Sequence, residues 1–160
     1  MRSILRVPFR LVVLLAAIAS VRPLAAAAQG TGAQEQLWDA ATQGDTAAMA
    51  TALRRGAVID SLDTRRNPNG RRALNWAAWY NHPVAIRFLI ARDATVNLAN
   101  GTGFTPLHHA VENGSLDAAR TLLALGADRT LRNRFGRRPV DLARLRGRAD
   151  LAALLDSLPP

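Results

Sequence analysis

Three histidines are the residues of this chain that first suggest chemistry, namely His82, His108 and His109. Glu112 follows His109 by three positions, so on a helix the two side chains would share one face and could hold a metal ion or a proton. One histidine and one carboxylate are too few ligands for a zinc site, and the chain has no cysteine to add thiolates. We therefore expect no metal and no cofactor.

Acidic pairs and catalytic motifs give no stronger indication of an enzyme. Asp60 and Asp63 are the closest carboxylates that could act as general acid and base, but nothing in their loop-like segment fixes their geometry. The sequence contains no GxSxG, no HExxH and no phosphate-binding glycine loop. We expect a protein that is not an enzyme.

The composition indicates one folded domain with a basic surface. The 160 residues are 49% hydrophobic and 21% charged, which supports a core and excludes wholesale disorder. The 21 basic residues, all arginine, outnumber 12 acidic ones and give a formal net charge of +9. Because the preference for arginine fits a GC-rich coding sequence as well as a chemical role, the charge alone does not identify a partner.

Residues 1–28 have the order of a secretory signal peptide. Arginines come first, an apolar run from Leu11 to Val21 follows, and the small residues that end at Ala28 mark the expected cleavage site. A retained membrane anchor is the alternative, but the apolar run covers only about 16 Å, roughly half of a bilayer's hydrocarbon core. We expect a periplasmic or secreted protein, with a short linker at 29–33 and no membrane span in the mature chain.

A period of 33 residues organises the rest of the sequence. Gly70, Gly103 and Gly136 lie 33 residues apart, and apolar residues follow each of them at matching positions. A more divergent copy precedes them, separated by four extra residues in a loop-like stretch. Such a period predicts a solenoid, in which each helix pair buries its apolar face against its neighbours. The expected repeat domain spans 34–158, with units at 34–66, 67–99, 100–132 and 133–157.

The third unit carries the clearest motif. Thr105-Pro106 favours a helix start, and Gly114 favours the left-handed turn that ends that helix. The stretch TPLHHAVENG, followed by LLALGAD, resembles the ankyrin repeat. The resemblance implies an all-α ankyrin-repeat solenoid of about four helix-turn-helix repeats with hairpin-like loops, preceded by the signal peptide. It also implies structural roles for His82 and His108. Together with the leading segment, it suggests an exported, bacterial periplasmic type of ankyrin protein.

The resemblance places the candidate binding surface on the inner helices and the hairpin tips. Large aromatic residues in the inner helix of the second unit predict an interface hot spot, although Trp76 is also placed to pack between repeats. His109 is expected to face the concave side. The candidate residues are Trp76, Trp79, Tyr80, His109, Glu112 and Asn113 on the inner helices and Arg66, Arg71, Phe104, Arg134 and Arg137 near the tips.

Three functional hypotheses remain open at this point. The first and leading hypothesis is a non-catalytic scaffold of the bacterial envelope, because ankyrin arrays are overwhelmingly binding scaffolds. It would act as a monomer on a protein partner, with no nucleic acid expected. The second is a salt-sensitive binder of anionic envelope ligands through the arginine-rich hairpin edge, unless that edge is ordinary solvated surface. The third is an accessory subunit or inhibitor of an exported enzyme.

Overall fold

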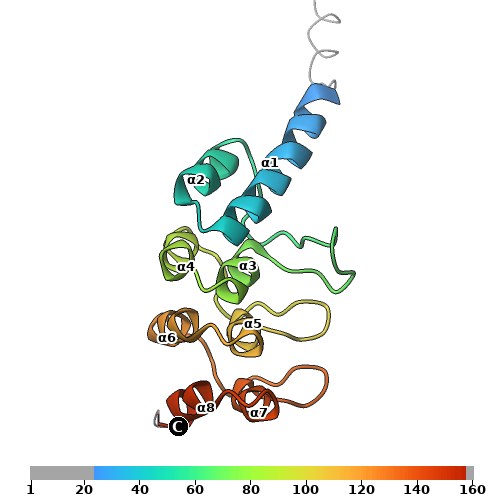
Figure 1. Ribbon diagram of the computed structural model, residues 1–160. Helices are drawn as coiled ribbons and strands as arrows, with labels where there is room; N and C mark the ends of the chain where they lie inside the picture. The colour runs from blue at the N-terminus through green and yellow to red at the C-terminus, as the bar shows by residue number, and fades with distance from the viewer. Residues whose placement is uncertain (1–23, 158–160) are drawn as a thin grey trace, which may run out of the picture.

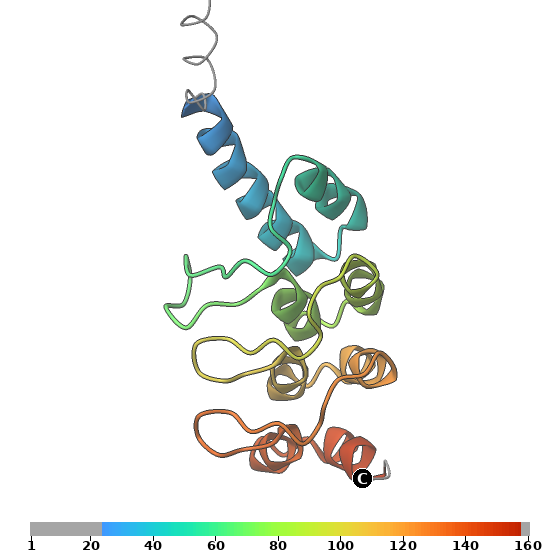
Figure 2. The same ribbon diagram turned by 180° about the vertical axis from the view of Figure 1, so that it is seen from behind.

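The structure, a computed structural model, describes residues 24–157 and consists there of eight helices without a named strand. Figures 1 and 2 show the helices stacked in pairs, with loops projecting from one side of the stack. This arrangement confirms the predicted all-α solenoid. The expected signal peptide lies mostly outside the described residues. The helices are α1 (Leu24–Gln43), α2 (Thr46–Arg54), α3 (Ala73–Trp79), α4 (Pro83–Ile90), α5 (Pro106–Asn113), α6 (Leu116–Ala124), α7 (Pro139–Leu145) and α8 (Ala149–Asp156).

The helices form two columns. The inner column contains α1, α3, α5 and α7, in which each helix packs on the next, and the outer column contains α2, α4, α6 and α8. Leu107 on α5 and Leu122 on α6 are buried between the columns, whereas Leu123 is only partly buried. Each pair therefore depends on its neighbours for burial of its apolar face.

Helix α1 differs from the other inner helices because it is longer and extends beyond the stack (Figure 1). The expected linker at 29–33 is wrong, since these residues belong to α1 and Ala33 is fully buried in the core. Gly30 and Gly32 are poor helix formers and favour a linker, but the helix continues through them into the segment that packs on the core from Ala33 onward.

The inner helices start in the same way although their sequences differ. In α5 the backbone N–H of Thr105 donates to His108 Nδ1 at 3.2 Å. In α3 the Arg72 N–H donates to Asn75 Oδ1 at 2.8 Å, and in α7 the Arg138 N–H donates to Asp141 Oδ2 at 2.9 Å. The side chain three residues into each helix thus satisfies the same backbone donor, so the departures from the TPLH pattern preserve the turn.

Neighbouring pairs interlock where each inner helix ends. The ring of His82 packs against Gly44, so closely that a Cβ at Gly44 would lie 2.8 Å from Nδ1, and His82 Nε2 bonds the Thr42 carbonyl at 2.9 Å. Arg148 packs on Gly114 in the same way. At the junction between the second and third units the sizes are reversed. Asn81, with φ 57°, takes the turn position that Gly44 and Gly114 occupy elsewhere, and the small Ser115 takes the position of His82 and Arg148.

Asparagine residues shape the loops. Asn100 Oδ1 accepts the backbone N–H of Phe104 at 2.9 Å, and Asn133 Oδ1 accepts that of Arg137 at 3.1 Å. Consecutive loops are joined by backbone bonds from Gly101 N to Asn69 O at 2.9 Å and from Arg134 N to Thr102 O at 3.0 Å. The loops therefore form a linked row beside the inner helices.

Candidate functional site

The loop before α3 is fixed to the stack, contrary to our expectation that nothing holds Asp60 and Asp63. Asp63 and Arg71 exchange backbone hydrogen bonds of 2.8 and 3.0 Å. The buried Asp63 carboxylate accepts from Trp76 Nε1 at 3.1 Å and from Arg65 Nε at 2.9 Å. Burial alone would raise the pKa of Asp63, but the hydrogen bonds from Arg65 outweigh it and lower that pKa. Asp63 is therefore an ionised anchor for the loop.

Arg71 lies over the aromatic rings of α3. Its guanidinium carbon is 4.6 Å from the Trp76 ring centre and 4.1 Å from that of Trp79. Burial lowers the pKa of Arg71, and the negative charge of Glu112 partly opposes this change. Its Nε is buried and has no hydrogen-bond partner among the described residues. The side chain is thus held by aromatic contacts and carries an unused donor.

His109 lies beneath Phe104 instead of on the surface, so its predicted exposure is wrong. The side chain is 3% exposed, and its ring centre is 5.5 Å from that of Phe104 and 6.1 Å from that of Trp79. Burial, with smaller contributions from the charges of Arg71 and His108, lowers the pKa of His109 to about 3. The ring is therefore neutral at neutral pH, and neither of its nitrogens has a partner among the described residues.

These side chains surround a cavity of about 240 Å³ between the inner helices and the loops, which we call the hairpin pocket. Aromatic rings and amides form most of its walls, while Arg71 and Glu112 are its charged residues. Its lining residues are Asn67, Asn69, Arg71, Trp79, Asn100, Thr102, Phe104, His109, Glu112 and Phe135.

Five predicted site residues meet in this pocket, namely Arg71, Trp79, Phe104, His109 and Glu112. Phe135 and the asparagines that line the pocket were not among the predicted site residues. The recurrence of asparagine at positions 67, 100 and 133, one repeat apart, was the available signal. Phe135 is mostly exposed, but its ring centre lies 6.4 Å from that of Phe104, which links the third and fourth loops.

Other predicted residues do not line the pocket. Trp76 is 3% exposed and belongs to the core, so its assignment to the binding surface is wrong. Tyr80 is 43% exposed and stacks on Trp76, with ring centres 6.0 Å apart. Asn113 is exposed, but its amide donates to the Trp79 carbonyl at 2.8 Å and thereby joins two repeats. Its role is at least partly structural.

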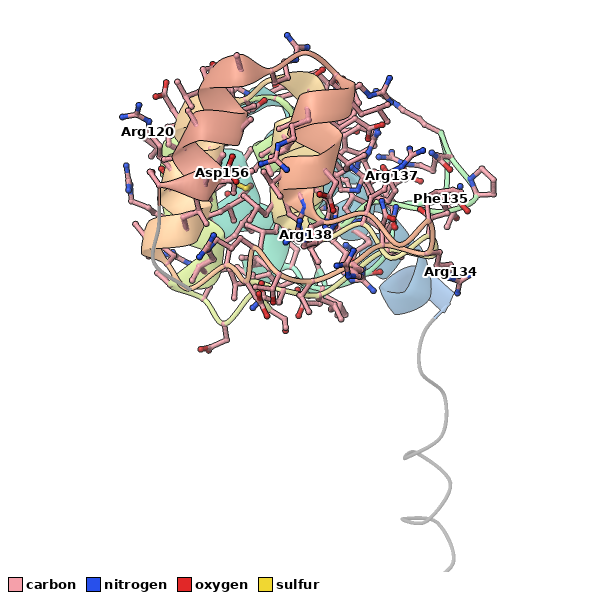
Figure 3. All side chains as sticks on the ribbon, turned by 90° about the horizontal axis from the view of Figure 1, so that it is seen from below. Arg120, Arg134, Phe135, Arg137, Arg138 and Asp156 are labelled. Atoms are coloured by element: carbon pink, nitrogen blue, oxygen red, sulfur yellow. The ribbon has the colours of Figure 1, made fainter. Side chains whose placement is uncertain are left out.

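The exposed arginines lie at the outer ends of the loops. Figure 3 shows Arg134, Phe135 and Arg137 gathered at the fourth loop, on the opposite side of the molecule from Arg120. Within residues 24–157, neither Arg134 nor Arg137 forms an ion pair, and the same holds for Arg66 in the second loop. These three predicted residues are accessible but separate from the pocket wall.

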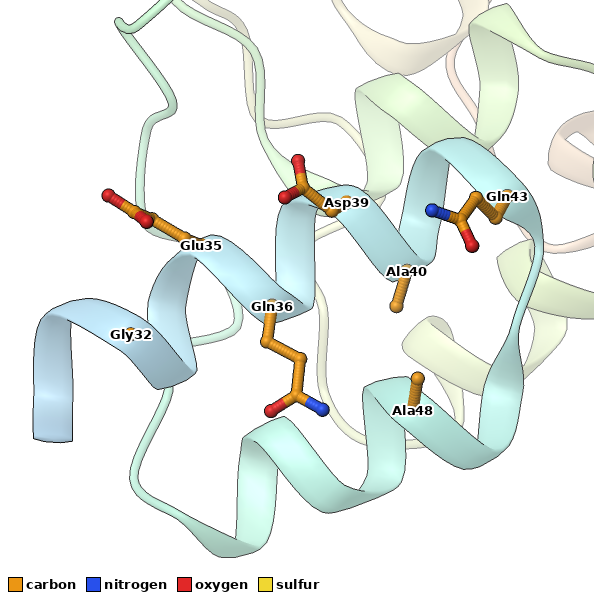
Figure 4. A pocket seen from close by; sticks show the side chains of 7 residues that line it. All are labelled: Gly32, Glu35, Gln36, Asp39, Ala40, Gln43 and Ala48. Carbon is orange, nitrogen blue, oxygen red and sulfur yellow. The ribbon is translucent and has the colours of Figure 1, made fainter.

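A second hollow, of about 420 Å³, lies between α1 and α2 (Figure 4). In it, Gln36 points toward α2, and Ala40 and Ala48 face one another. Among the described residues, none of its lining side chains has a buried polar atom without a partner. The hairpin pocket, which has such atoms, is therefore the better candidate site.

The described part of the chain shows neither a metal-binding cluster nor a membrane-spanning helix. No group of three or more histidine, aspartate or glutamate residues is placed there to hold a metal ion. No helix of that part is both long enough and apolar enough to cross a membrane.

Comparison with known proteins identifies the family. A family model described as ankyrin repeats in three copies matches residues 24–133, more than half of the chain. The chain belongs to the ankyrin-repeat family. The stacked helix pairs and the loops at their sides agree with this assignment, and α7 and α8 extend the array beyond the matched residues.

Curated relatives of this ankyrin protein come from eukaryotes and viruses. The chain is 35% identical over 98 residues to the ankyrin repeat domain-containing protein SAT10 of the fungus Stachybotrys chartarum, covering 61% of this chain and 5% of that protein. It is 38% identical over 100 residues to protein phosphatase 1 regulatory subunit 27 of Mus musculus, covering 62% and 63% of the two chains. The alignments thus span less than two thirds of either relative.

Ankyrin repeats generally mediate protein–protein interaction and are usually not catalytic themselves. The relatives do not support the expected bacterial exported type.

Proposed function

We propose that this ankyrin protein is a non-catalytic scaffold that binds a protein partner across the hairpin pocket and the adjoining loops. The observation that carries the proposal is the half-buried aromatic surface of Trp79 and Phe104, both of which line the cavity. Aromatic side chains in partly enclosed hollows are frequent hot spots of protein interfaces.

The loops support the same proposal because they present a prepared surface. Backbone bonds join the second loop to the third and the third to the fourth. A partner would therefore bind without the cost of ordering these segments, which favours affinity. The mouse relative is named a regulatory subunit of a phosphatase, and an accessory role of that general kind is one form of the proposed binding.

The test is capture of partners from an extract by the chain, followed by affinity measurements with purified components. Phe104→Ala should weaken binding of a captured protein by at least tenfold, because it removes a wall of the pocket. Phe88→Ala is the matched control, since Phe88 is also a partly buried phenylalanine but lies on the outer helix α4. Equal affinity of both variants and the unchanged chain would exclude the pocket as the binding site.

The compartment is a further proposal that rests on residues 1–28 alone. We propose export to the periplasm or the outside of the cell, with cleavage after Ala28. Such cleavage would retain the buried Ala33 of α1. Determining the N-terminal residue of the exported chain by mass spectrometry tests this: Gln29 is expected, and an intact Met1 in the cytosol contradicts it.

The second candidate function is binding of an anionic ligand at the arginine-rich edge. It is favoured by the exposure of Arg134 and Arg137, which have no carboxylate partner within residues 24–157. Binding through this edge would fall steeply with salt and with Arg134→Met, while Phe104→Ala would leave it unchanged.

A further inference from the structure

The hairpin pocket contains an arginine, Arg71, that forms no ion pair within the described residues, although the negative charge of Glu112 acts on it from nearby. Its buried Nε has no hydrogen-bond partner among those residues. Glu112, the carboxylate of the same pocket, is bonded instead to Arg146, with 2.8 Å between Nη2 and Oε1. A half-buried guanidinium gains more from an anion than an exposed one, because solvent screens the pair less.

His109 provides a second unused polar group in the pocket. Its ring is buried, and neither nitrogen is bonded within the described part of the chain. A neutral imidazole always carries one N–H donor, and an unsatisfied buried donor is unfavourable. An acceptor that enters the pocket would therefore relieve this unfavourable burial while it also pairs with Arg71.

The charge and size of the pocket restrict what can enter. Its volume of about 240 Å³ is below the range of roughly 300–1,000 Å³ typical of small-molecule sites, which favours a single side chain of a larger partner. A planar carboxylate matches the guanidinium fork and carries one negative charge. A phosphate would bring additional charge next to Glu112. A basic side chain would have to compete with Arg146 for Glu112.

We propose that the hairpin pocket binds the carboxylate of an aspartate or glutamate side chain from the protein partner. Arg71 pairs with the carboxylate, His109 donates to it from the floor, and Trp79, Phe104 and Phe135 contact its methylene groups. The proposal rests on the protein-binding function proposed above and specifies the anchor residue of the partner.

The experiment is selection of a random-peptide display library on the full chain, followed by titration of the enriched peptides. Selected peptides should share one acidic position. Changing that residue to the corresponding amide should weaken binding by tenfold or more, because a charge-assisted hydrogen bond is lost. In Arg71→Met, which keeps a long apolar side chain, the acidic and amide peptides should bind equally. Arg134→Met is the matched control, and there the difference should persist.

The possible outcomes distinguish a failure of the proposed acidic anchor residue from a failure of the proposed protein-binding function. Peptides that lose binding with Phe104→Ala but share no acidic position, or whose preference for the acid survives Arg71→Met, overturn the anchor and leave the binding function intact. A selection that yields no peptide sensitive to Phe104→Ala overturns both. Arg71→Lys guards against a folding artefact, since it keeps the charge and should restore part of the preference for the acid.

Discussion

Arg71 in the second loop and Arg137 in the fourth occupy the same place in the repeat, since they are separated by two repeat lengths, yet their surroundings differ. Arg71 is half-buried over two tryptophans, whereas Arg137 is exposed. Phe104 is the corresponding residue of the third unit. The same repeat position is therefore a half-buried arginine in the second unit, a phenylalanine of the pocket wall in the third and an exposed arginine in the fourth.

The inner helix that follows each loop explains the difference. Trp76 and Trp79 of α3 are replaced in α7 by Leu142 and Leu145, which offer no aromatic face to an arginine. Leu145 is 58% exposed, whereas Trp79, with Arg71 over its ring, is partly buried. The accessibility of a loop arginine thus depends on the residues five and eight positions further along the chain.

The largest loss of stability is expected from a cavity between the stacked helices, which position both loops. Leu122→Ala should lower the free energy of unfolding by about 2–5 kcal/mol, because Leu122 is fully buried and its removal leaves a cavity. Urea denaturation followed by circular dichroism measures the change. Leu125→Ala, on the same segment but exposed, should cost less than about 0.5 kcal/mol, and equal effects would contradict the repeat register.

The second-largest effect is a pH dependence of the free energy of unfolding that comes from the third unit. His109 of that unit is replaced at the same repeat position of the fourth unit by Leu142, which does not titrate. The pKa of His109 is about 3 in the folded chain and about 6.5 when unfolded, so between these values the unfolded chain binds the additional proton. The free energy of unfolding should fall as the pH decreases through this window, by up to about 1.4 kcal/mol per pH unit from this group. Above the window the group contributes no pH dependence.

His109→Leu isolates that contribution from the carboxylates that also titrate in acid. Unfolding of the variant and of the unchanged chain, measured from pH 7 to pH 4, should show a weaker decrease for the variant. Parallel curves for the two proteins would mean that His109 is protonated in the folded state.

A third change should make the second unit resemble the fourth. Trp79→Leu removes one of the two rings beneath Arg71 and should reduce stability by about 1–2 kcal/mol through lost aromatic burial and cation–π contact. The Arg71 guanidinium should also become mobile, which 15N relaxation of its Nε–H reports. An unchanged, rigid guanidinium would show that Trp76 alone confines Arg71.

The reverse change should have the smallest effect. Leu145→Trp gives Arg137 an aromatic neighbour at the spacing found for Arg71 and Trp79, and should stabilise the chain by about 0.5–1 kcal/mol, the scale of an exposed cation–π pair. The gain should disappear in the double variant with Arg137→Met. A gain that persists there would reflect burial of the new ring and not contact with the arginine.

The fold was predictable because its determinants are local and periodic. Glycines at a fixed spacing, the TPLH turn and the apolar faces of the helices each act within one repeat. The helix at 29–33 could not be predicted, because Gly30 and Gly32 disfavour helix locally and the burial of Ala33 depends on packing with other parts of the chain.

The candidate site was predicted only in part because its geometry depends on neighbouring repeats. Trp79 and Phe104, both predicted as partner-binding residues, line one hollow, and their contact with a partner stays a prediction. Trp76 is buried in contact with Asp63, and His109 in contact with Phe104, and both partners lie in loops. The 33-residue period does not predict which inner-helix side chain a loop will cover. Phe135 belongs to the site because the fourth loop contacts the third. A contact between units cannot be predicted from the sequence of one unit.

The interlock between inner helices has a consequence for recombining these units. Large His82 faces Gly44, small Ser115 follows Asn81, and Arg148 faces Gly114, so each junction has its own pairing of sizes. Placing the third unit directly after the first would set Ser115 against Gly44 and leave a gap, whereas placing the fourth after the second would force Arg148 against Asn81. The residues at the junctions therefore restrict the order in which the units can stack. In a rearranged array, both residues of a junction would have to be exchanged together.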